Sequence, residues 1–260
     1  MRRVKIFLSF SLCLCFMFLF VSNSEASSKI GIIGAMDIEV NNLKAAADIS
    51  RKIIKADMEF CEGKINNMNV VIVKCGIGKV NAGICAQILI DLFGVTHIIN
   101  TGVAGSLNNN IKIGDIVIAR EAVQHDYDVT SIGFKPGEIP YTGLYAFETD
   151  KYLREKALKA ANKIINPDDH KIFEGRICTG DQFISNKEAK NKITSVFGGE
   201  CCEMESGAIA QTCYLNHVPF IIIRSISDTA DETEIADFHE FETEMANICA
   251  NIVEYMIEGF

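Results

Sequence analysis

The sequence predicts an α/β protein in which helices sandwich a sheet. From Lys29 onward, short runs rich in β-branched residues alternate with longer segments of helical periodicity. Several of the short runs are apolar on both faces, as buried parallel strands must be. A chain of 260 residues with 48% hydrophobic content and only 4 Pro has enough apolar side chains for one sizeable core. We therefore expect a single compact domain over residues 27–260.

The individual elements follow from these patterns in chain order. Five apolar runs predict strands: Lys29 to Ile33, Val70 to Cys75, His97 to Asn100, Ile116 to Ala119 and Phe220 to Ile223. Helical periodicity predicts helices over Val80 to Phe93 and Tyr152 to Ile165. Apolar residues recur every three or four positions from Phe241 to Met256, which predicts a last helix with one stripe on the sheet. The Gly and Pro residues of Ser131 to Gly143 predict a surface loop.

Residues 1–26 are typical of a secretory signal peptide. Basic residues precede an uncharged apolar run from Ile6 to Val21, and small or polar residues follow up to Ala26. The run is shorter than the roughly 20 residues of a spanning helix, which favours cleavage near Ala26 over a retained membrane anchor. We therefore expect an exported chain, periplasmic, at the cell surface or secreted, with no stable membrane span. Lipid modification of Cys13 or Cys15 in the run is the less favoured alternative.

The charge of the mature chain bears on its partners. Cleavage removes Arg2, Arg3 and Lys5 together with one acid, Glu25, so the formal net charge moves from −9 to −11. An acidic chain is a poor match for nucleic acid or an anionic membrane surface. We therefore expect no nucleic-acid partner.

The cysteines show no spacing that indicates a disulfide. Ten cysteines, less the two in the leader, leave eight, mostly in apolar stretches where small buried hydrophobes belong. Unpaired thiols are at risk in an oxidising compartment. Either the surroundings are reducing, or a bridge exists that the sequence does not assign. No His or Cys stands at metal-ligand spacing from Cys201 and Cys202, so we expect no metal site.

Three glycine-bearing turns follow predicted strands and mark a candidate ligand-binding edge. They contain Gly34, Gly76 to Lys79 and Thr101 to Gly105. Ligands bind at the carboxyl ends of strands in open α/β sheets, and glycine lets backbone N–H groups approach a ligand closely. None of the turns matches the dinucleotide fingerprint or the phosphate loop. We therefore expect neither a nicotinamide cofactor nor ATP, and no other cofactor is implied.

Four acids stand where a structural interpretation would favour apolar residues. Glu39 falls in the first helical turn after a strand, and Asp228 ends a predicted strand. Glu203 and Glu205 come directly after a short apolar segment. Each one alone could be a helix cap or a solvated acid. Together they suit glycosidic cleavage, in which one carboxyl group protonates the leaving group and another activates water. The spacing does not assign these roles.

Motifs along the whole mature chain resemble the nucleoside phosphorylase/nucleosidase superfamily, and specifically its 5′-methylthioadenosine/S-adenosylhomocysteine nucleosidases. Their order and rough spacing fit, and together they are highly specific. The motifs are Ile30 to Val40 (IGIIGAMDIEV), Cys75 to Val80 (CGIGKV), Asn100 to Gly105 (NTGVAG), Thr179 to Ile184 (TGDQFI), Glu203 to Ser206 (EMES), Arg224 to Asp231 (RSISDTAD) and Phe238 to Phe241 (FHEF).

The resemblance implies a single-domain, three-layer α/β/α sandwich around a mixed sheet, assembled as a homodimer. It also implies hydrolysis of the N-glycosidic bond of 5′-methylthioadenosine and S-adenosylhomocysteine, with release of adenine and a thioribose. Carried over by motif, Asp228 would be the general acid that protonates adenine N7, and Glu39 the base that activates water. Glu205, with the backbone near Met204, would bind the ribose hydroxyls.

The resemblance further implies a set of substrate contacts. Phe183 would stack on adenine while the Ile184 backbone reads its polar edge. The remaining predicted contacts are Ala104 and Gly105 at the base, Met36, Ile77 and Phe238 around the ribose and alkylthio group, Glu203 and Ser227 in the same site, and Val129, Ile132 and Pro140 from the other subunit.

Two positions depart from the family pattern. Val103 stands where the family commonly has Ser, so a hydroxyl near the sugar or the water is missing. Ile132 stands where the family often has an aromatic residue at the alkylthio end. We expect both to affect the rate or the choice of 5′-substituent and to leave the core chemistry intact.

Other functions remain open on the sequence alone. The site motifs would suit a hydrolase of another adenine nucleoside, such as 5′-deoxyadenosine or aminofutalosine. A phosphorylase of the same superfamily is disfavoured because the turn after Gly34 carries Asp37 and Glu39 and no Arg. An exported binding protein or polysaccharide adhesin would call for a Lys/Arg cluster, and only scattered pairs such as Arg51 and Lys52 occur.

Overall fold

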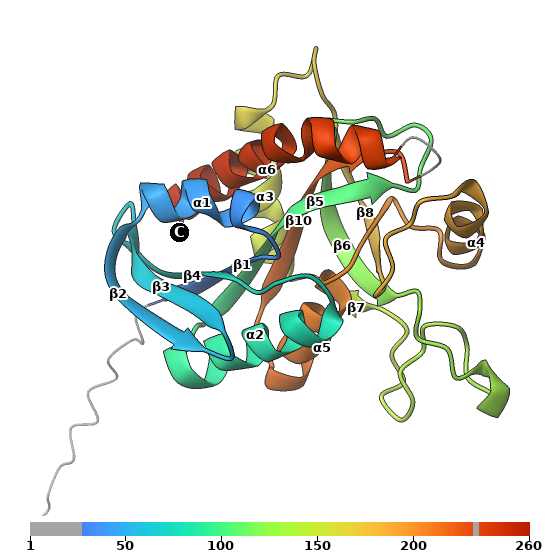
Figure 1. Ribbon diagram of the computed structural model, residues 1–260. Helices are drawn as coiled ribbons and strands as arrows, with labels where there is room; N and C mark the ends of the chain where they lie inside the picture. Colours follow the sequence, from blue (N-terminus) through green and yellow to red (C-terminus); the bar gives the residue numbers. More distant parts are fainter. Residues whose placement is uncertain (1–27, 231–233) are drawn as a thin grey trace, which may run out of the picture.

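A computed structural model describes residues 28–230 and 234–260, and the side chains of 231–240 are outside the described set. The described chain forms three layers around one mixed sheet (Figure 1), as the sequence predicts. The predicted signal peptide, residues 1–26, lies outside the described residues. Among the described residues, no helix is long and apolar enough to cross a membrane.

Ten strands form the sheet, in the order β10-β6-β8-β9-β5-β1-β4-β3-β2, with β7 on β6. The strands are β1 (Lys29–Gly34), β2 (Asp48–Lys55), β3 (Met58–Ile65), β4 (Met68–Lys74), β5 (His97–Ser106), β6 (Ile116–Gln124), β7 (Phe147–Glu148), β8 (Ile172–Thr179), β9 (Cys201–Glu203) and β10 (Phe220–Asp228). The central strands β4, β1, β5 and β10 are parallel, and their side chains are buried on both faces.

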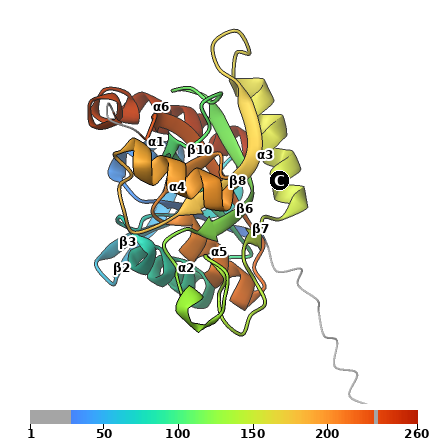
Figure 2. The same ribbon diagram turned by 90° about the vertical axis from the view of Figure 1, so that its right-hand side faces the viewer.

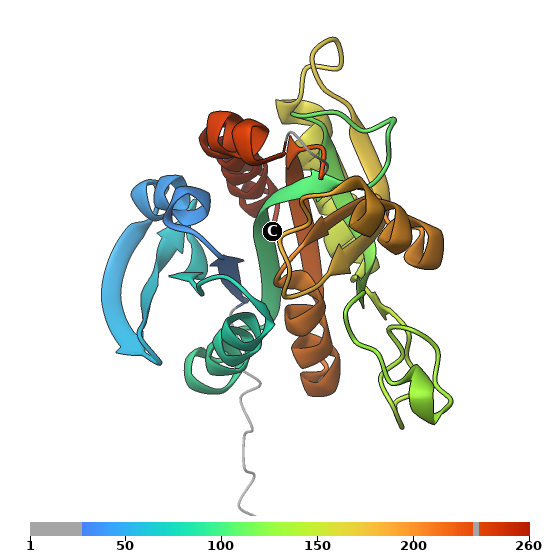
Figure 3. The same ribbon diagram turned by 45° about the vertical axis from the view of Figure 1, so that its right-hand side comes forward.

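Part of the sheet closes on itself. Strand β10 pairs with both β5 and β6, and β9 bridges β5 and β8, so these five strands form a ring. β5 pairs with β1 near its start and with β9 at its end. It can do so because it is ten residues long and curves strongly, as Figure 3 shows. The end of β5 therefore lies between β9 and β10, where three elements bring their polar residues together.

The helices divide between the two faces of the sheet. α1 (Asp37–Ala46), α3 (Lys151–Ile164) and α6 (Glu234–Glu258) share one apolar cluster on one face, and α2 (Lys79–Phe93) and α5 (Ser206–Asn216) pack on the other (Figure 1). The short helix α4 (Lys187–Phe197) lies beyond the end of β5 (Figures 1 and 2). The predicted helices correspond to α2, α3 and α6.

The largest difference from the sequence prediction concerns Thr101 to Gly105, which was expected to form a turn. These residues continue β5 to Ser106 and pair with β10. The small residues serve close packing: a Cβ at Gly102 would overlap the Glu39 carboxylate, and one at Gly105 would lie 2.5 Å from Asp228 Oδ1. The sequence patterns also gave no prediction for β2, β3, β7, β8, β9, α4 and α5.

Candidate active site

One pocket opens where β1, β5 and β10 end and α1 and α5 begin. It brings together every site residue predicted from the same chain except Phe238, whose side chain is not described. Four further lining residues were not among the predicted contacts: Ala35, Val103, Gln182 and Cys202. The lining residues are Ala35, Met36, Glu39, Ile77, Val103, Ala104, Gly105, Gln182, Phe183, Ile184, Cys202, Glu203, Met204, Glu205, Ser227 and Asp228.

Glu39 is held by the backbone at the start of α1. The N–H groups of Ala35 and Met36 donate to its Oε2 at 2.6 and 3.0 Å, and Val103 N–H donates to its Oε1 at 3.1 Å. Burial raises the pKa of this carboxyl, while the charge of Arg224 and the backbone donors oppose that rise. The carboxylate is thus fixed in orientation, and its raised proton affinity suits a general base.

Asp228 ends β10 beside Gly105 of β5, just after an irregularity in the pairing of the two strands. Its side chain is buried. Ser227 Oγ donates to Oδ2 at 2.8 Å, and Ala230 N–H donates to Oδ1 at 3.0 Å. Both carboxylates therefore abut the same strand, Glu39 at Gly102 and Asp228 at Gly105.

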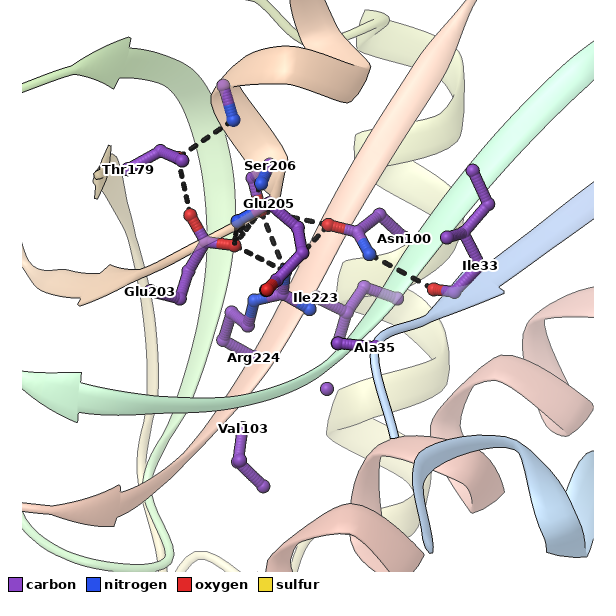
Figure 4. Close-up of polar contacts among 12 residues, drawn as sticks. Ile33, Ala35, Asn100, Val103, Thr179, Glu203, Glu205, Ser206, Ile223 and Arg224 are labelled. Carbon is purple, nitrogen blue, oxygen red and sulfur yellow. Dashed lines mark hydrogen bonds and ion pairs between the residues drawn. The ribbon is translucent and has the colours of Figure 1, made fainter. Parts of the chain in front are cut away.

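Glu203 lines the pocket, but its carboxylate is engaged by the protein itself (Figure 4). Arg224 Nη2 donates to Oε2 at 2.6 Å, and Ser206 donates to the same oxygen through its N–H and its hydroxyl. Thr179 Oγ1 donates to Oε1. Although burial alone would raise the pKa of Glu203, the charge of Arg224 and these hydrogen bonds lower it. Glu203 is therefore an ionised partner for Arg224. It lines the pocket, as predicted for a substrate contact, but its carboxylate oxygens are already hydrogen-bonded within the protein.

Glu205 lies two residues further on in a different electrostatic setting. It occupies the N-cap position of α5, and Gly78 N–H donates to its Oε1 at 2.9 Å. Burial and the neighbouring negative charge of Glu203 raise its pKa to about 8. Glu205 can thus carry a proton near neutral pH and can offer both donor and acceptor to hydroxyl groups.

The rim of the pocket is apolar and more open. Phe183 is 48% exposed and Ile77 is 54% exposed, although both line the pocket. Ile184 is buried behind them, and Met36 and Met204 are partly buried. A half-exposed aromatic plane at the rim of a pocket is suited to stacking on a base.

The departure at Val103 has a visible consequence. Its N–H holds Glu39, while its side chain belongs to an apolar cluster with Met245 and Ala246 of α6. The wall of the pocket is therefore apolar at this point.

The residues predicted to reach a partner's pocket lie away from this one. The segment between β6 and β7 contains the predicted surface loop Ser131 to Gly143 and projects from the sheet (Figure 3). It carries Val129, Ile132 and Pro140. None of them lines the pocket of the same chain. Ile132, within a short 3-10 turn, is 67% exposed.

Arg224 and Asn100 are the main functional residues that the sequence analysis did not assign. Arg224 Nη2 donates to Asn100 Oδ1 at 2.6 Å, and Asn100 Nδ2 donates to the Ile33 carbonyl at 3.0 Å (Figure 4). Both side chains are buried. A signal was present, because a charged residue inside the apolar run Phe220 to Ile226 needs a buried partner.

The pocket has no cationic lining. None of the described lining residues is Lys, Arg or His, and the described residues hold no cluster of acids, His and Cys suited to a metal ion. The eight described cysteines are all buried and unpaired. Burial raises the pKa of the thiols of Cys75, Cys201 and Cys202, which keeps them protonated and unreactive.

The family model described as the phosphorylase superfamily matches residues 29–258, which include the mixed sheet and all the buried carboxylates of the pocket. The chain is therefore a protein of the phosphorylase class. A nucleosidase of Staphylococcus haemolyticus named 5′-methylthioadenosine/S-adenosylhomocysteine nucleosidase is 40% identical over 230 residues, which cover 88% of this chain and 99% of the relative.

Solved structures agree with this assignment. The 5′-methylthioadenosine/S-adenosylhomocysteine nucleosidase of Neisseria meningitidis in complex with methylthio-immucillin-A has a TM-score of 0.86 and 34% identity, covering 90% of this chain and 100% of that one. A futalosine hydrolase of Helicobacter pylori has a TM-score of 0.85 and 32% identity, covering 91% and 100%. The chain belongs to the 5′-methylthioadenosine/S-adenosylhomocysteine nucleosidase family within the phosphorylase superfamily.

Proposed function

We propose that the chain hydrolyses the N-glycosidic bond of 5′-methylthioadenosine and S-adenosylhomocysteine, releasing adenine and the 5-thioribose product. The observation that carries the proposal is the pairing of two buried acids, Glu39 and Asp228, at one strand in a pocket with an apolar rim. Glycosidic cleavage needs an acid for the leaving group and a base for water.

Each carboxyl group has a role in this chemistry. Asp228 protonates N7 of adenine, so that the base departs as a neutral molecule, and Glu39 takes a proton from the attacking water. Glu205 binds the ribose hydroxyls as positive charge grows on the sugar ring. Phe183, which lines the pocket, stacks on the base.

Water is favoured over phosphate as the nucleophile. A phosphorylase must hold a dianion, which calls for cationic side chains at the site. The described lining residues include four acids and no cation, and the nearby Arg224 is paired with Glu203. A phosphate ion in this pocket would be repelled.

The direct test is adenine release from 5′-methylthioadenosine and S-adenosylhomocysteine by the mature protein, with and without phosphate. We expect equal release in both buffers, with free thioribose as the second product. Formation of a ribose 1-phosphate, or dependence on phosphate, would establish a phosphorylase instead. Absence of release from any adenine nucleoside would leave a binding protein on this fold.

The futalosine hydrolase similarity supports a second candidate substrate class. That structure is nearly as similar to this chain as the methylthioadenosine nucleosidase is. The half-exposed rim places little restriction on the 5′-substituent. Competition among methylthioadenosine, adenosylhomocysteine, 5′-deoxyadenosine and aminofutalosine in one assay would rank kcat/KM directly.

We further propose that the protein is a homodimer and that each pocket borrows residues from the partner. Large apolar side chains are exposed on α2 and α5, which pack against each other: Val80 at 72%, Ile84 at 43%, Tyr214 at 46% and Leu215 at 60%. An exposed apolar patch of this kind is typical of a subunit interface. Ile132 in the projecting loop would reach the partner's alkylthio site.

Sedimentation velocity tests the dimer. We expect a dimer for the mature protein and a monomer with reduced activity for the double variant Val80→Asp/Leu215→Asp. Ile54→Asp, which changes a 70% exposed side chain on the edge strand β2, is the matched control and should stay dimeric. A monomeric wild-type protein with full activity would contradict the proposal.

We propose that residues 1–26 direct export and are removed. The charged start, the apolar run and the small residues up to Ala26 support this. Burial of the eight described thiols is compatible with an oxidising compartment, since protonated buried thiols resist oxidation. Expression of the full chain in a bacterium, followed by fractionation and N-terminal sequencing, should give an exported product that begins at Ser27. A product with Met1 in the cytosol would contradict export.

A further inference from the structure

A buried lysine stands behind the pocket. Lys190 of α4 is 6% exposed, although the neighbouring lysines of that helix, Lys187 and Lys192, are exposed. Its ammonium group donates to the Thr229 carbonyl at 2.6 Å. Among the described residues no carboxylate forms an ion pair with it. Burying a cation against one neutral carbonyl costs free energy, so the contact calls for a functional explanation.

The carbonyl that Lys190 holds belongs to the turn that carries Asp228. Thr229 follows Asp228 directly, and Ala230 adopts a left-handed backbone with φ of 51°. This conformation is unfavourable for a residue with a Cβ. It nevertheless points the Ala230 N–H at Asp228 Oδ1, at 3.0 Å.

One peptide group therefore connects the ammonium to the carboxyl. The peptide between Thr229 and Ala230 accepts from Lys190 at its oxygen and donates to Asp228 at its nitrogen. A cation on the oxygen polarises the peptide and strengthens its N–H as a donor, since hydrogen bonds in a chain reinforce one another. A stronger donor at Oδ1 stabilises the carboxylate that remains after Asp228 gives up its proton.

We propose that Lys190 is a positioning residue for Asp228: it fixes the strained turn at 229–230 and stabilises the ionised product state of the acid. The inference rests on the proposed function, in which Asp228 is the general acid. Lys190 itself does not touch the substrate, because it is absent from the pocket lining.

The other titratable groups described around this turn do not duplicate the role of Lys190. Cys202 of β9 is held neutral, because burial raises the pKa of its thiol well above the ordinary range. Glu203 is paired with Arg224. Lys112, before β6, lines a cavity with Lys190 but is exposed, so solvent screens its charge.

The test compares Lys190→Met, which keeps the length of the stem, with Lys190→Gln, which keeps a donor but no charge. Lys192→Met is the matched control on the exposed side of α4. For Lys190→Met we expect kcat to fall on the order of tenfold with KM within about twofold, as for a misoriented general acid. We also expect the alkaline limb of the kcat/KM profile to move to higher pH, because the ionised acid is no longer stabilised.

Lys190→Gln separates the two proposed roles of Lys190, which are fixing the turn at 229–230 and stabilising the ionised Asp228. Its kcat should be higher than that of Lys190→Met, because the amide can still hold the turn. The alkaline limb of its kcat/KM profile should stay at the higher pH found for Lys190→Met, because the positive charge is missing. Circular dichroism and Tm select folded variants, and Lys190→Gln carries the test if Lys190→Met does not fold. Folded variants with the wild-type alkaline limb would overturn the inference, whatever their kcat. If wild-type protein released no adenine, the proposed function would fail instead.

Discussion

The floor and the rim of the pocket are built in opposite ways. What we call the floor lies beneath the pocket lining and consists of Glu203, which lines the pocket, together with Arg224, Asn100 and Ser206 behind it. All four are buried and hydrogen-bonded to one another. The rim presents Ile77 and Phe183, apolar side chains about half exposed to solvent. The floor thus has one permitted arrangement, because each buried polar group depends on its neighbours. The rim has no such constraint.

This difference separates chemistry from substrate choice. Backbone hydrogen bonds fix both acids beside the floor: Val103 N–H of β5 holds the Glu39 carboxylate, and the Glu205 N–H at the start of α5 donates to Glu203 of the floor. The rim contacts whatever extends from the ribose, and can accept different groups without disturbing the acids. A family that includes relatives acting on different 5′-substituents is expected to vary at the rim and to keep the floor.

The largest effect should come from neutralising one of the two acids that line the pocket above the floor, Asp228 or Glu39. Asp228→Asn retains the shape but cannot supply a proton to N7, so kcat should fall by about 10³-fold or more at unchanged fold. Glu39→Gln should have a comparable effect because water loses its base. Steady-state adenine release measures both, and Tm confirms the fold.

Substrate binding provides the control for these variants. Both should still bind methylthioadenosine, since the apolar rim is intact. Turnover by Asp228→Asn near the wild-type rate would remove Asp228 from the acid role.

The next largest effect should be a loss in the free energy of unfolding when the buried ion pair of the floor is broken. Arg224→Met leaves the Glu203 carboxylate buried without its partner, and breaking a buried pair in this way costs about 3–5 kcal/mol. The double variant Glu203→Gln/Arg224→Met removes both charges and should regain part of that loss. Urea unfolding of the three proteins measures the difference. Equal stability of the single and double variants would show that the ion pair does not hold the floor together.

The sequence could predict much of this arrangement. Strand runs such as Val70 to Cys75 are apolar on both faces, so burial and parallel pairing follow directly. The motif acids Glu39, Glu205 and Asp228 stand at strand ends or helix starts, and the pocket contains all three. Local patterns of apolar residues were sufficient for the strands, whereas the family motifs were needed to select these three acids.

Features that depend on distant contacts were missed. Thr101 to Gly105 has the composition of a turn, yet it continues β5, because β10 supplies hydrogen bonds from more than a hundred residues away. Glu203 looked like another site acid, and only the position of Arg224 on β10 shows that its carboxylate is engaged internally. Tertiary contacts override local propensity in both cases.

A pH-dependent effect should distinguish the two adjacent acids. The pKa of Glu205 is raised to about 8 in the folded protein, above its ordinary value of 4.5. Between these values the folded state binds a proton that the unfolded state has released, so Glu205 makes stability fall as pH rises towards 8. Below pH 4.5 both states are protonated, and the penalty is absent.

Glu205→Gln should remove this contribution, so the stability of the variant relative to wild type should increase between pH 5 and pH 8. Urea unfolding at several pH values measures the trend, with the exposed Glu148→Gln as control. A difference that stays constant with pH would show that Glu205 is ionised throughout, as Glu203 is.

The smallest effect should come from the rim. Phe183→Ala removes the aromatic plane and should raise KM about tenfold, since stacking of one base on an aromatic side chain contributes about 1–3 kcal/mol. Because Phe183 is 48% exposed and forms no part of the floor, kcat should change far less than KM, and Tm should hardly move. Tyr152→Ala, a 55% exposed aromatic on α3, is the control. If Phe183→Ala lowered kcat as strongly as it raised KM, the rim would be contributing to the transition state, and the separation between floor and rim would not hold.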